Sequence, residues 1–398
     1  MTDSRGVLYL NPTAQIGGAE RSLLDLAASL DRRRFTPRLM CLGQGPLLAE
    51  ATRMGVSVEA VPVSEGFERA SLRGRRTGAL GLAASMLRAA PTLMAVRRAA
   101  GRTAATIVHS NGNKTHLLAA PLRRRDTRIV WHVRDFWRDR APERLLLRVA
   151  RVSADALIAN SAAVAAHLQR LGAGPRQVHA IANGIDLHRF APEGPHAELR
   201  AEAGWPKSVR LVGMVGVLAR WKGQAVFLEA AAAVARRHPD VRFVVVGGEI
   251  YRTAGHGDFA PELARLAGDL GLGDTLTFTG HRQDVPDVLR ALDVAVHASI
   301  EPEPFGRVIA EAMACARPVV WARGGGADEI VGDTALATLG VPGGDPAALA
   351  AAIERALADP DQAAGWAAEG RARIAAHFDL GTHVARVQDL YGMLVNSR

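Results

Sequence analysis

The sequence predicts an α/β protein with two doubly wound parallel sheets, one in each half of the chain. Short apolar runs alternate with segments whose apolar residues recur at helical spacing, and glycine-rich turns follow several of the runs. A length of 398 residues is long for one hydrophobic core and suits two domains. Because strands that alternate with helices pair in parallel through right-handed crossovers, ligands are expected at the carboxyl ends of the strands.

The first half opens with a predicted strand at residues 7–10, a turn and a helix. Gly17 and Gly18 lie in this turn and could bring phosphate or substrate close to bare backbone, although a tight turn explains a glycine pair about as well. Further strands are predicted at residues 35–42, 56–61, 106–110, 128–133, 156–161 and 178–183.

Arginines concentrate in the first half of a chain whose formal net charge is +9. Residues 71–103 mix them with apolar side chains, which predicts an amphipathic helical pair. Such a surface suits an anionic membrane, an anionic substrate or nucleic acid, but a solvated basic helix packed on the sheet is the more frequent explanation.

The second half repeats the alternation after a break at residues 191–195, where we expect the linker. Strands are predicted at residues 209–216, 241–248, 275–279, 294–298 and 319–322, and helices at residues 224–237, 261–270, 285–292, 346–358, 361–377 and 380–394.

The composition excludes several classes of protein. Neither a secretory leader nor an apolar run long enough to span a membrane is visible, so we expect a cytoplasmic chain, with peripheral attachment at the inner face of the membrane as an option. The two cysteines, Cys41 and Cys315, have no spacing typical of metal or redox chemistry and are expected to be buried thiols.

Two carboxylates flank the start of a predicted helix near residue 305. Glu303 lies in the turn before this helix, and Glu311 lies two turns into it. The helix start offers unpaired N–H groups to an anion, and Gly306 leaves the backbone open to a ligand. Carboxylates at this spacing suit the hydroxyls of a sugar and a ribose, although each alone is better explained as a helix-start or solvated residue.

The run E-P-F-G-x7-E-A-M-A resembles the E-x7-E signature of the retaining glycosyltransferases of family 4, which have the GT-B fold. N-G-I-D-x-x-x-F at residues 183–190 is similar to the family's segment before the second domain. The resemblance implies two Rossmann-like domains facing across a cleft. An acceptor domain at 1–190 would be completed by a C-terminal helix at 378–398, and a nucleotide-sugar domain would span 191–377.

The resemblance also implies roles for individual residues. Lys222 matches the lysine of the family run G-R-L-x-x-x-K-G, but Val217 stands where the arginine is usual, so Arg220 is a candidate replacement or simply a surface residue. In the family these cations stabilise the diphosphate, while Phe305 and Gly306 offer backbone N–H groups. His132, at the end of a strand, would contact the donor sugar.

Three further residues are weaker candidates from their positions. Arg282 lies in a turn like the one that the family places near the nucleotide base, and it is equally a plain loop residue. His109 and Asn111 end a predicted strand and could hold the acceptor.

The expected partners are a nucleoside diphosphate sugar and a sugar, lipid-linked or small-metabolite acceptor, with no cofactor, no metal and no nucleic acid. No nucleophile for double displacement is evident, so same-face attack assisted by the leaving phosphate, the mechanism that the resemblance implies, is the working hypothesis. A nicotinamide oxidoreductase is disfavoured because G-x-G-x-x-G is absent after both opening strands. A weakly active scaffold that binds membrane or nucleic acid stays open because of Val217.

Overall fold

The computed structural model describes residues 4–63, 79–138, 140–249 and 259–396. The chain forms two compact units. Unit 1 comprises Met1–Asn183 and Gly381–Arg398, and unit 2 comprises Gly184–Leu380. The sequence predicted the first boundary at residue 190, a few residues after Asn183, and the second at residue 378, a few residues before Gly381.

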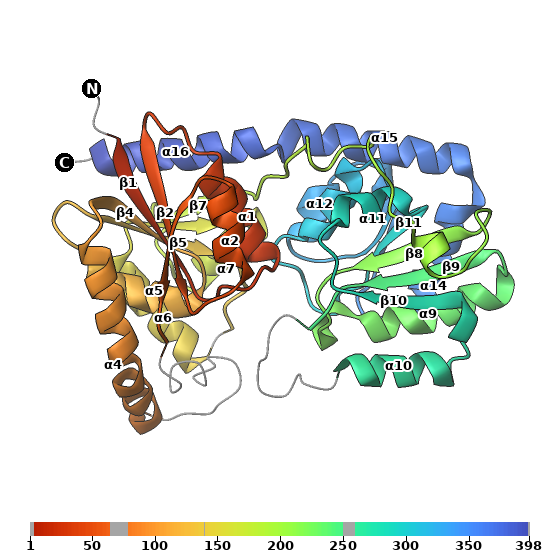
Figure 1. Cartoon of the computed structure of the whole chain (residues 1–398), viewed down its shortest axis with the longest axis horizontal. Coiled ribbons are helices and arrows are strands. Elements are labelled where there is room, and N and C mark those ends of the chain that lie inside the picture. The colour runs from red at the N-terminus through yellow and green to blue at the C-terminus, as the bar shows by residue number, and fades with distance from the viewer. Residues whose placement is uncertain (1–3, 64–78, 139, 250–258, 397–398) are drawn as a thin grey trace. The chain divides into compact units, whose positions relative to one another are not determined.

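Unit 1 is built on a seven-stranded sheet in the order β3-β2-β1-β4-β5-β6-β7, with every pair parallel. Its strands are β1 (Arg5–Asn11), β2 (Phe35–Leu42), β3 (Ser57–Val61), β4 (Ala105–Ser110), β5 (Arg128–Val133), β6 (Ala156–Ala159) and β7 (Val178–Ala180). Its helices are α1 (Gly18–Ala28), α2 (Pro46–Arg53), α4 (Ala79–Gly101), α5 (Asn113–Ala119), α6 (Ala141–Ser153), α7 (Ala162–Arg170) and α16 (Leu380–Asn396) (Figure 1).

The two faces of this sheet differ in character. Trp131 and Val133 of β5 join one hydrophobic cluster with apolar residues of β1, β2 and β4. Because side chains alternate along a strand, His132 lies on the opposite face, together with His109 and Tyr9. Helix α16 covers that face, where its Tyr391 contacts both Tyr9 and His109.

Unit 2 is built on a six-stranded parallel sheet in the order β10-β9-β8-β11-β12-β13. Its strands are β8 (Arg210–Val215), β9 (Val241–Val246), β10 (Leu276–Gly280), β11 (Val294–His297), β12 (Val319–Ala322) and β13 (Gly340–Val341). Its α-helices are α8 (Leu199–Glu202), α9 (Gln224–Arg237), α10 (Phe259–Asp269), α11 (Val285–Ala291), α12 (Arg307–Ala314), α13 (Gly326–Val331), α14 (Pro346–Ala358) and α15 (Pro360–His377). The predicted pair of doubly wound parallel sheets is confirmed.

The segment expected to be the linker belongs to unit 2. The Arg290 guanidinium donates to the carbonyl oxygens of Ala191 (3.1 Å) and Pro195 (2.7 Å) and so binds this segment to α11. A proline- and glycine-rich composition predicts the loss of regular structure but not such anchoring by a distant arginine.

The predicted basic helical pair at 71–103 lies partly outside the described residues. Within the described part of this segment, the structure has one helix, α4. Arg97 and Arg98 are exposed at its end, whereas Val96 is buried against the sheet. Throughout the described ranges, no helix is both long and apolar enough to cross a membrane.

Candidate active site

The site in unit 2 is organised by the start of helix α12. The chain leaves β11, passes through residues 298–306 and enters α12 at Gly306, whose φ of 97° lies in the left-handed region that glycine adopts without strain. Phe305, by contrast, is buried and packs its ring against Phe378, so that only its backbone could serve a ligand.

The structure brings together Lys222 and Glu303, to which separate motifs gave separate ligand roles. The Lys222 Nζ lies 2.6 Å from Glu303 Oε1, and the two side chains are 24% and 11% exposed. The same carboxylate oxygen accepts a hydrogen bond from Ser299 Oγ at 2.5 Å and lies 3.3 Å from His297 Nε2.

These contacts determine the charge state of Glu303. Burial by itself would raise the pKa of the carboxyl group, but the Lys222 ammonium and the His297 ring outweigh it and hold that pKa well below its usual range. Glu303 is therefore an ionised, oriented acceptor of hydrogen bonds.

Close backbone packing places the lysine beside the glutamate. Lys222 lies in a short 3-10 turn, Arg220–Lys222, that follows β8, and the neighbouring β11 leads into the loop with Glu303. The Ile300 N–H donates to the Trp221 carbonyl at 2.9 Å and ties the turn to the loop. Gly223 (φ 78°) permits the approach, since a Cβ there would lie 1.9 Å from the Ala298 carbonyl oxygen.

The second carboxylate, Glu311, is also paired with a cation. Arg307 Nε donates to Glu311 Oε1 at 2.6 Å across one turn of α12, and the side chains are only 10% and 11% exposed. Both carboxylates of the E-x7-E pair thus face a fixed positive charge.

Two other predicted cations are engaged elsewhere. Arg220 pairs with Glu262 at 2.6 Å and lies over the Phe259 ring, at 5.0 Å from its centroid. Arg282 binds Asp284 through two hydrogen bonds and Glu202 through a third, and these partners raise its pKa. Neither contact places these arginines beside Glu303, and their proposed ligand roles stay predictions.

In unit 1 the predicted glycines lie at the start of α1. Gly17 is the N-cap residue, and its N–H donates to the Glu20 carboxylate at 3.1 Å. Gly18 is exposed, so of the pair it is the glycine with backbone open to a ligand.

His132 lies at the end of β5, as predicted, but its side chain is completely buried and presents no surface to a sugar. Its Nδ1 lies 3.2 Å from His109 Nε2 and 3.3 Å from Arg134 Nη2. Burial, reinforced by the nearby Arg134 charge, lowers the pKa of both histidines well below the usual value, so both rings are neutral. The expected contact with donor sugar therefore finds no support in the placement of the ring.

Asn111 is better placed than His109 for a ligand at the strand ends, since it follows β4 directly. It is 2% exposed, accepts a hydrogen bond from Arg134 and donates one to Asn11 at 2.8 Å. His109 lies within β4 and is hydrogen-bonded to Tyr391 on the sheet face that α16 covers.

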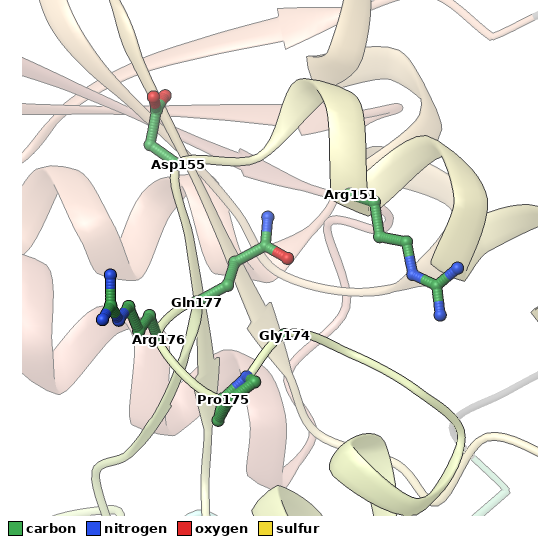
Figure 2. A pocket seen from close by; sticks show the side chains of 6 residues that line it. All are labelled: Arg151, Asp155, Gly174, Pro175, Arg176 and Gln177. Carbon is green, nitrogen blue, oxygen red and sulfur yellow. The ribbon is translucent and has the colours of Figure 1, made fainter.

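A surface depression in unit 1 lies at the end of the sheet opposite to the carboxyl ends of its strands (Figure 2). Its polar groups serve the fold, since the Gln177 amide donates to the Ala150 and Ala154 carbonyls and Asp155 accepts from the Ile129 N–H. Arg151 and Arg176 extend away from each other in this view. Asp155 and Gln177 precede β6 and β7, so the depression lies at the amino ends of these strands, away from the edge where parallel sheets bind ligands.

Four residues at these sites were missed by the sequence analysis. Arg307 had a usable signal, because it precedes Glu311 by four residues on one helix. His297 and Ser299 follow the alternation of β11 toward its carboxyl end, which was a weaker signal. Arg134, two residues after His132, had none. Over the ranges that the structure covers, His, Cys, Asp and Glu form no group of three or more suited to a metal ion.

Comparisons with known proteins match both halves of the chain to glycosyltransferase descriptions. Residues 16–189 match the family described as Glycosyltransferase Family 4, and residues 196–373 match Glycosyl transferases group 1. The first range contains Asn111, His132 and Arg134 of unit 1, and the second contains Lys222, Glu303, Arg307 and Glu311 of unit 2.

Individual relatives carry related names. The chain is 37% identical over 243 residues to D-inositol 3-phosphate glycosyltransferase 2 of Catenulispora acidiphila, covering 60% of this chain and 56% of that protein. It is 35% identical over 257 residues to D-inositol 3-phosphate glycosyltransferase of Salinispora arenicola, covering 61% and 55%. The chain thus spans about half the length of these curated relatives.

Solved structures extend the similarity to the whole chain. HepE of Anabaena in complex with UDP-glucose is 26% identical, with a TM-score of 0.83 and coverage of 98% of this chain and 99% of that one. The complex of HepE with UDP and glucose is 27% identical, with a TM-score of 0.81 and coverage of 97% and 99%. With two all-parallel Rossmann-like sheets and matches to both family descriptions, the chain belongs to the family 4 glycosyltransferases of the GT-B fold.

Proposed function

We propose that this protein is a retaining glycosyltransferase that moves a sugar from a nucleoside diphosphate sugar to an acceptor hydroxyl. The observation that carries the proposal is the contact of Lys222 with Glu303 at the start of α12. It joins a cation suited to a diphosphate and a carboxylate suited to sugar hydroxyls at the carboxyl ends of two neighbouring parallel strands.

Departure of the nucleotide builds negative charge on its diphosphate. Lys222 and the backbone N–H groups at Gly306 and Phe305 would stabilise this charge, since fixed donors in a site shielded from water act strongly on developing charge. Glu303 would accept from the sugar hydroxyls and Glu311 from the ribose. Because Lys222 already neutralises Glu303, the donor need not enter beside an unpaired anion.

Retention of configuration is proposed to arise by same-face attack, with the leaving phosphate accepting the acceptor's proton and without a metal. The placement of Glu303 supports this, because its ionised carboxylate is held by three hydrogen-bonding groups rather than left as a nucleophile. Mass-spectrometric trapping of a sugar ester on any carboxylate would contradict this mechanism and favour double displacement.

UDP-glucose is the first donor to test, because HepE binds it. D-inositol 3-phosphate is the first acceptor to test, because curated relatives are named for it, and sugars and lipid-linked glycans of cell-surface synthesis follow. The thermal stabilisation of the protein by UDP-, GDP- and ADP-glucose would identify the base.

Glu311→Ala tests the donor site directly. We expect the variant to lose most of the stabilisation by the preferred nucleotide, with the dissociation constant rising by about tenfold or more, as for a lost hydrogen bond to a charged group. Glu354→Ala is the matched control. Glu354 also pairs with an arginine of unit 2, Arg237, but it lies on helix α14 and not on the helix α12 that carries Glu311. Unchanged nucleotide binding by Glu311→Ala, measured by calorimetry, would remove the ribose assignment.

Attachment at the inner face of the membrane is a further part of the proposal. Exposed arginines near the end of α4 and after α5 favour it, among them Arg97, Arg98, Arg124 and Arg125. Cosedimentation with vesicles rich in phosphatidylglycerol should occur at low salt and decrease at high salt. Equal recovery with neutral vesicles would refute it. The alternative of a weakly active binding scaffold is less favoured, because Lys222, Glu303 and Glu311 are all in place.

A further inference from the structure

A buried hydrogen-bond chain in unit 1 runs from helix α16 to the carboxyl ends of the strands. Tyr391 Oη lies 2.6 Å from His109 Nδ1, and His109 Nε2 lies 3.2 Å from His132 Nδ1. Arg134 Nη2 reaches the same His132 nitrogen at 3.3 Å. The three ring side chains are completely buried, and no step of the proposed reaction uses them.

The chemistry of the donors fixes the protons along this chain. A guanidinium can only donate, so His132 Nδ1 must accept from Arg134. Because burial and the Arg134 charge keep the pKa of His132 well below its usual value, the ring is neutral and its proton is on Nε2. His109 then also donates to His132 from Nε2, and its Nδ1 accepts from the Tyr391 hydroxyl, whose own pKa is raised by burial. This contact, at 2.6 Å, is shorter than the 3.3 Å between the Tyr391 and Tyr9 hydroxyls, so the single Tyr391 proton is assigned to His109, and Tyr391 Oη accepts from the Tyr9 hydroxyl. The opposite tautomer of His132 would point an N–H at the N–H of Arg134.

On its other side, Arg134 fixes the orientation of a side-chain amide. Its Nε donates to Asn111 Oδ1, so the amide nitrogen of Asn111 faces Asn11, whose Oδ1 accepts at 2.8 Å. The Asn11 amide nitrogen in turn donates to the Thr13 carbonyl at 2.7 Å. Thr13 lies in the turn between β1 and α1 that ends at the predicted Gly17 and Gly18.

A second set of hydrogen bonds from Arg134 reaches Asn183, the last residue of the Met1–Asn183 part of unit 1. Arg134 Nη1 donates to Asn183 Oδ1 at 2.8 Å and to Ser22 Oγ at 3.3 Å, and Ser22 Oγ donates to Asn183 Oδ1 at 3.0 Å. The guanidinium therefore joins four segments of unit 1: the start of α1, the end of β4, the end of β5 and the residues after β7.

We propose that Arg134 is a positioning residue for the acceptor end of unit 1. The His132–His109–Tyr391 chain holds the Arg134 guanidinium in place, because His132 Nδ1 offers it a hydrogen-bond acceptor. The inference rests on the proposed function for its assignment of the acceptor to unit 1. It gives His132 a supporting role in place of direct contact with the donor sugar. It also makes α16, from the far end of the chain, part of the site's support.

The test begins with the tautomer of His132, which does not depend on any activity. In protein labelled with 15N-histidine, the His132 resonances are those absent from a His132→Asn variant. We expect a protonated Nε2 and an unprotonated Nδ1 in the wild-type protein. A protonated Nδ1 would overturn the proposal even if glycosyl transfer is shown, and the expected tautomer would stand even if transfer is not.

Arg134→Met and Arg134→Lys separate positioning from general structural support. Arg134→Met should give a mixture of His132 tautomers, whereas Arg134→Lys, which keeps a charged donor, should retain the wild-type tautomer. With UDP-glucose and D-inositol 3-phosphate as substrates, Arg134→Met should lower kcat/KM for the acceptor by at least about tenfold, leave the dissociation constant for UDP unchanged, and be partly rescued by lysine. Wild-type acceptor kinetics in Arg134→Met, or equal loss of UDP binding, would overturn the proposal.

Tyr391→Phe keeps the proposal falsifiable if Arg134→Met does not fold. Arg134 still donates to His132 in this variant, so His132 should keep its tautomer while the Nδ1 resonance of His109 shifts. A change of the His132 tautomer in Tyr391→Phe would show that the tyrosine, and not Arg134, sets the proton positions, and would refute the assignment.

Discussion

At the scale of single residues, the donor site has two carboxylate side chains, each 11% exposed, where an anionic ligand is proposed to bind. Each carboxylate has one cation within hydrogen-bond distance: Lys222 for Glu303 and Arg307 for Glu311. A buried carboxylate without such a partner would be protonated or would be displaced toward water. The pairs therefore keep both carboxylates ionised and oriented before a donor arrives.

Lys222→Met should make the stability of the protein depend on pH in the opposite sense from the wild type. In the wild type the pKa of Glu303 is below its ordinary value of 4.5, so the pair's contribution is fully present above that pH and is lost as pH falls through the folded value. Without the ammonium, burial is the largest remaining influence on the Glu303 pKa and raises it against the opposing His297 ring, so stability then falls as pH rises through the raised value. Urea unfolding should show a deficit that grows from acidic to neutral pH and reaches about 3 kcal/mol, the low end for removal of one partner of a buried pair, since the Lys222 side chain is 24% exposed.

The double variant Lys222→Met/Glu303→Gln is the control for this prediction. Since it has no carboxylate at residue 303, its deficit should no longer vary with pH. A deficit of Lys222→Met that stays constant over the same range would mean that Glu303 does not sense the lysine.

Residue-scale prediction from sequence succeeded where a motif fixes the backbone and failed where contacts are distant. Lys222 and Glu303 were inferred from separate motifs, and they meet because adjacent parallel strands end side by side. The pairing of Arg220 with Glu262, by contrast, depends on α10, which no local pattern links to the turn after β8. The proximity of Tyr391 to His109 spans 282 residues and was equally invisible.

At the scale of elements, the turn after β8 is held by a backbone approach that only glycine permits. Gly223 combines a left-handed φ with a Cβ position 1.9 Å from the Ala298 carbonyl oxygen. Gly271 has a similar φ of 72°, but a Cβ there meets nothing within 4 Å. The two glycines therefore separate conformational strain from steric conflict.

Gly223→Ala should destabilise the protein by at least about 3 kcal/mol, because the turn with Lys222 must move away from the loop with Glu303. Gly271→Ala should cost only about 1 kcal/mol, the strain of a left-handed alanine. Urea unfolding of both variants measures the difference. Equal costs would show that the turn adapts without displacement, and the proposed link between backbone approach and site geometry would be wrong.

Elements with buried surroundings were the best predicted from sequence. The strands expected at residues 35–42 and 128–133 coincide with β2 (Phe35–Leu42) and β5 (Arg128–Val133). The strand expected at residues 178–183 ends early, at Ala180, because its one neighbour, β6, ends at Ala159, the residue that pairs with Ala180. Its apolar pattern continues beyond the last hydrogen-bonding partner, and a pattern alone carries no information about partners.

At the scale of the whole molecule, the chain closes unit 1 with residues from its far end. Val384, Val387, Leu390 and Tyr391 of α16 are each no more than 5% exposed, and they cover the sheet face that carries Tyr9, His109 and His132. Further bonds reach α16 from the amino-terminal segment, since Gln388 Oε1 accepts from the Asp31 N–H at 2.7 Å. Unit 1 is therefore a discontinuous folding unit, whereas unit 2 is continuous in sequence.

Removal of residues 381–398 should consequently destabilise one unit and spare the other. Unit 1 would lose the burial of four large side chains, roughly 2 kcal/mol each, and would expose three polar rings of its sheet. Hydrogen exchange measured by mass spectrometry should show lost protection in β1 and β4, while β8 and β11 of unit 2 keep that of the full chain. Lys222, Glu303 and Glu311 all lie in unit 2, so the truncated chain should still bind UDP while losing transfer. Loss of protection in both sheets to the same extent would instead mean that the two units unfold as one, and that α16 supports the donor site as much as the acceptor end.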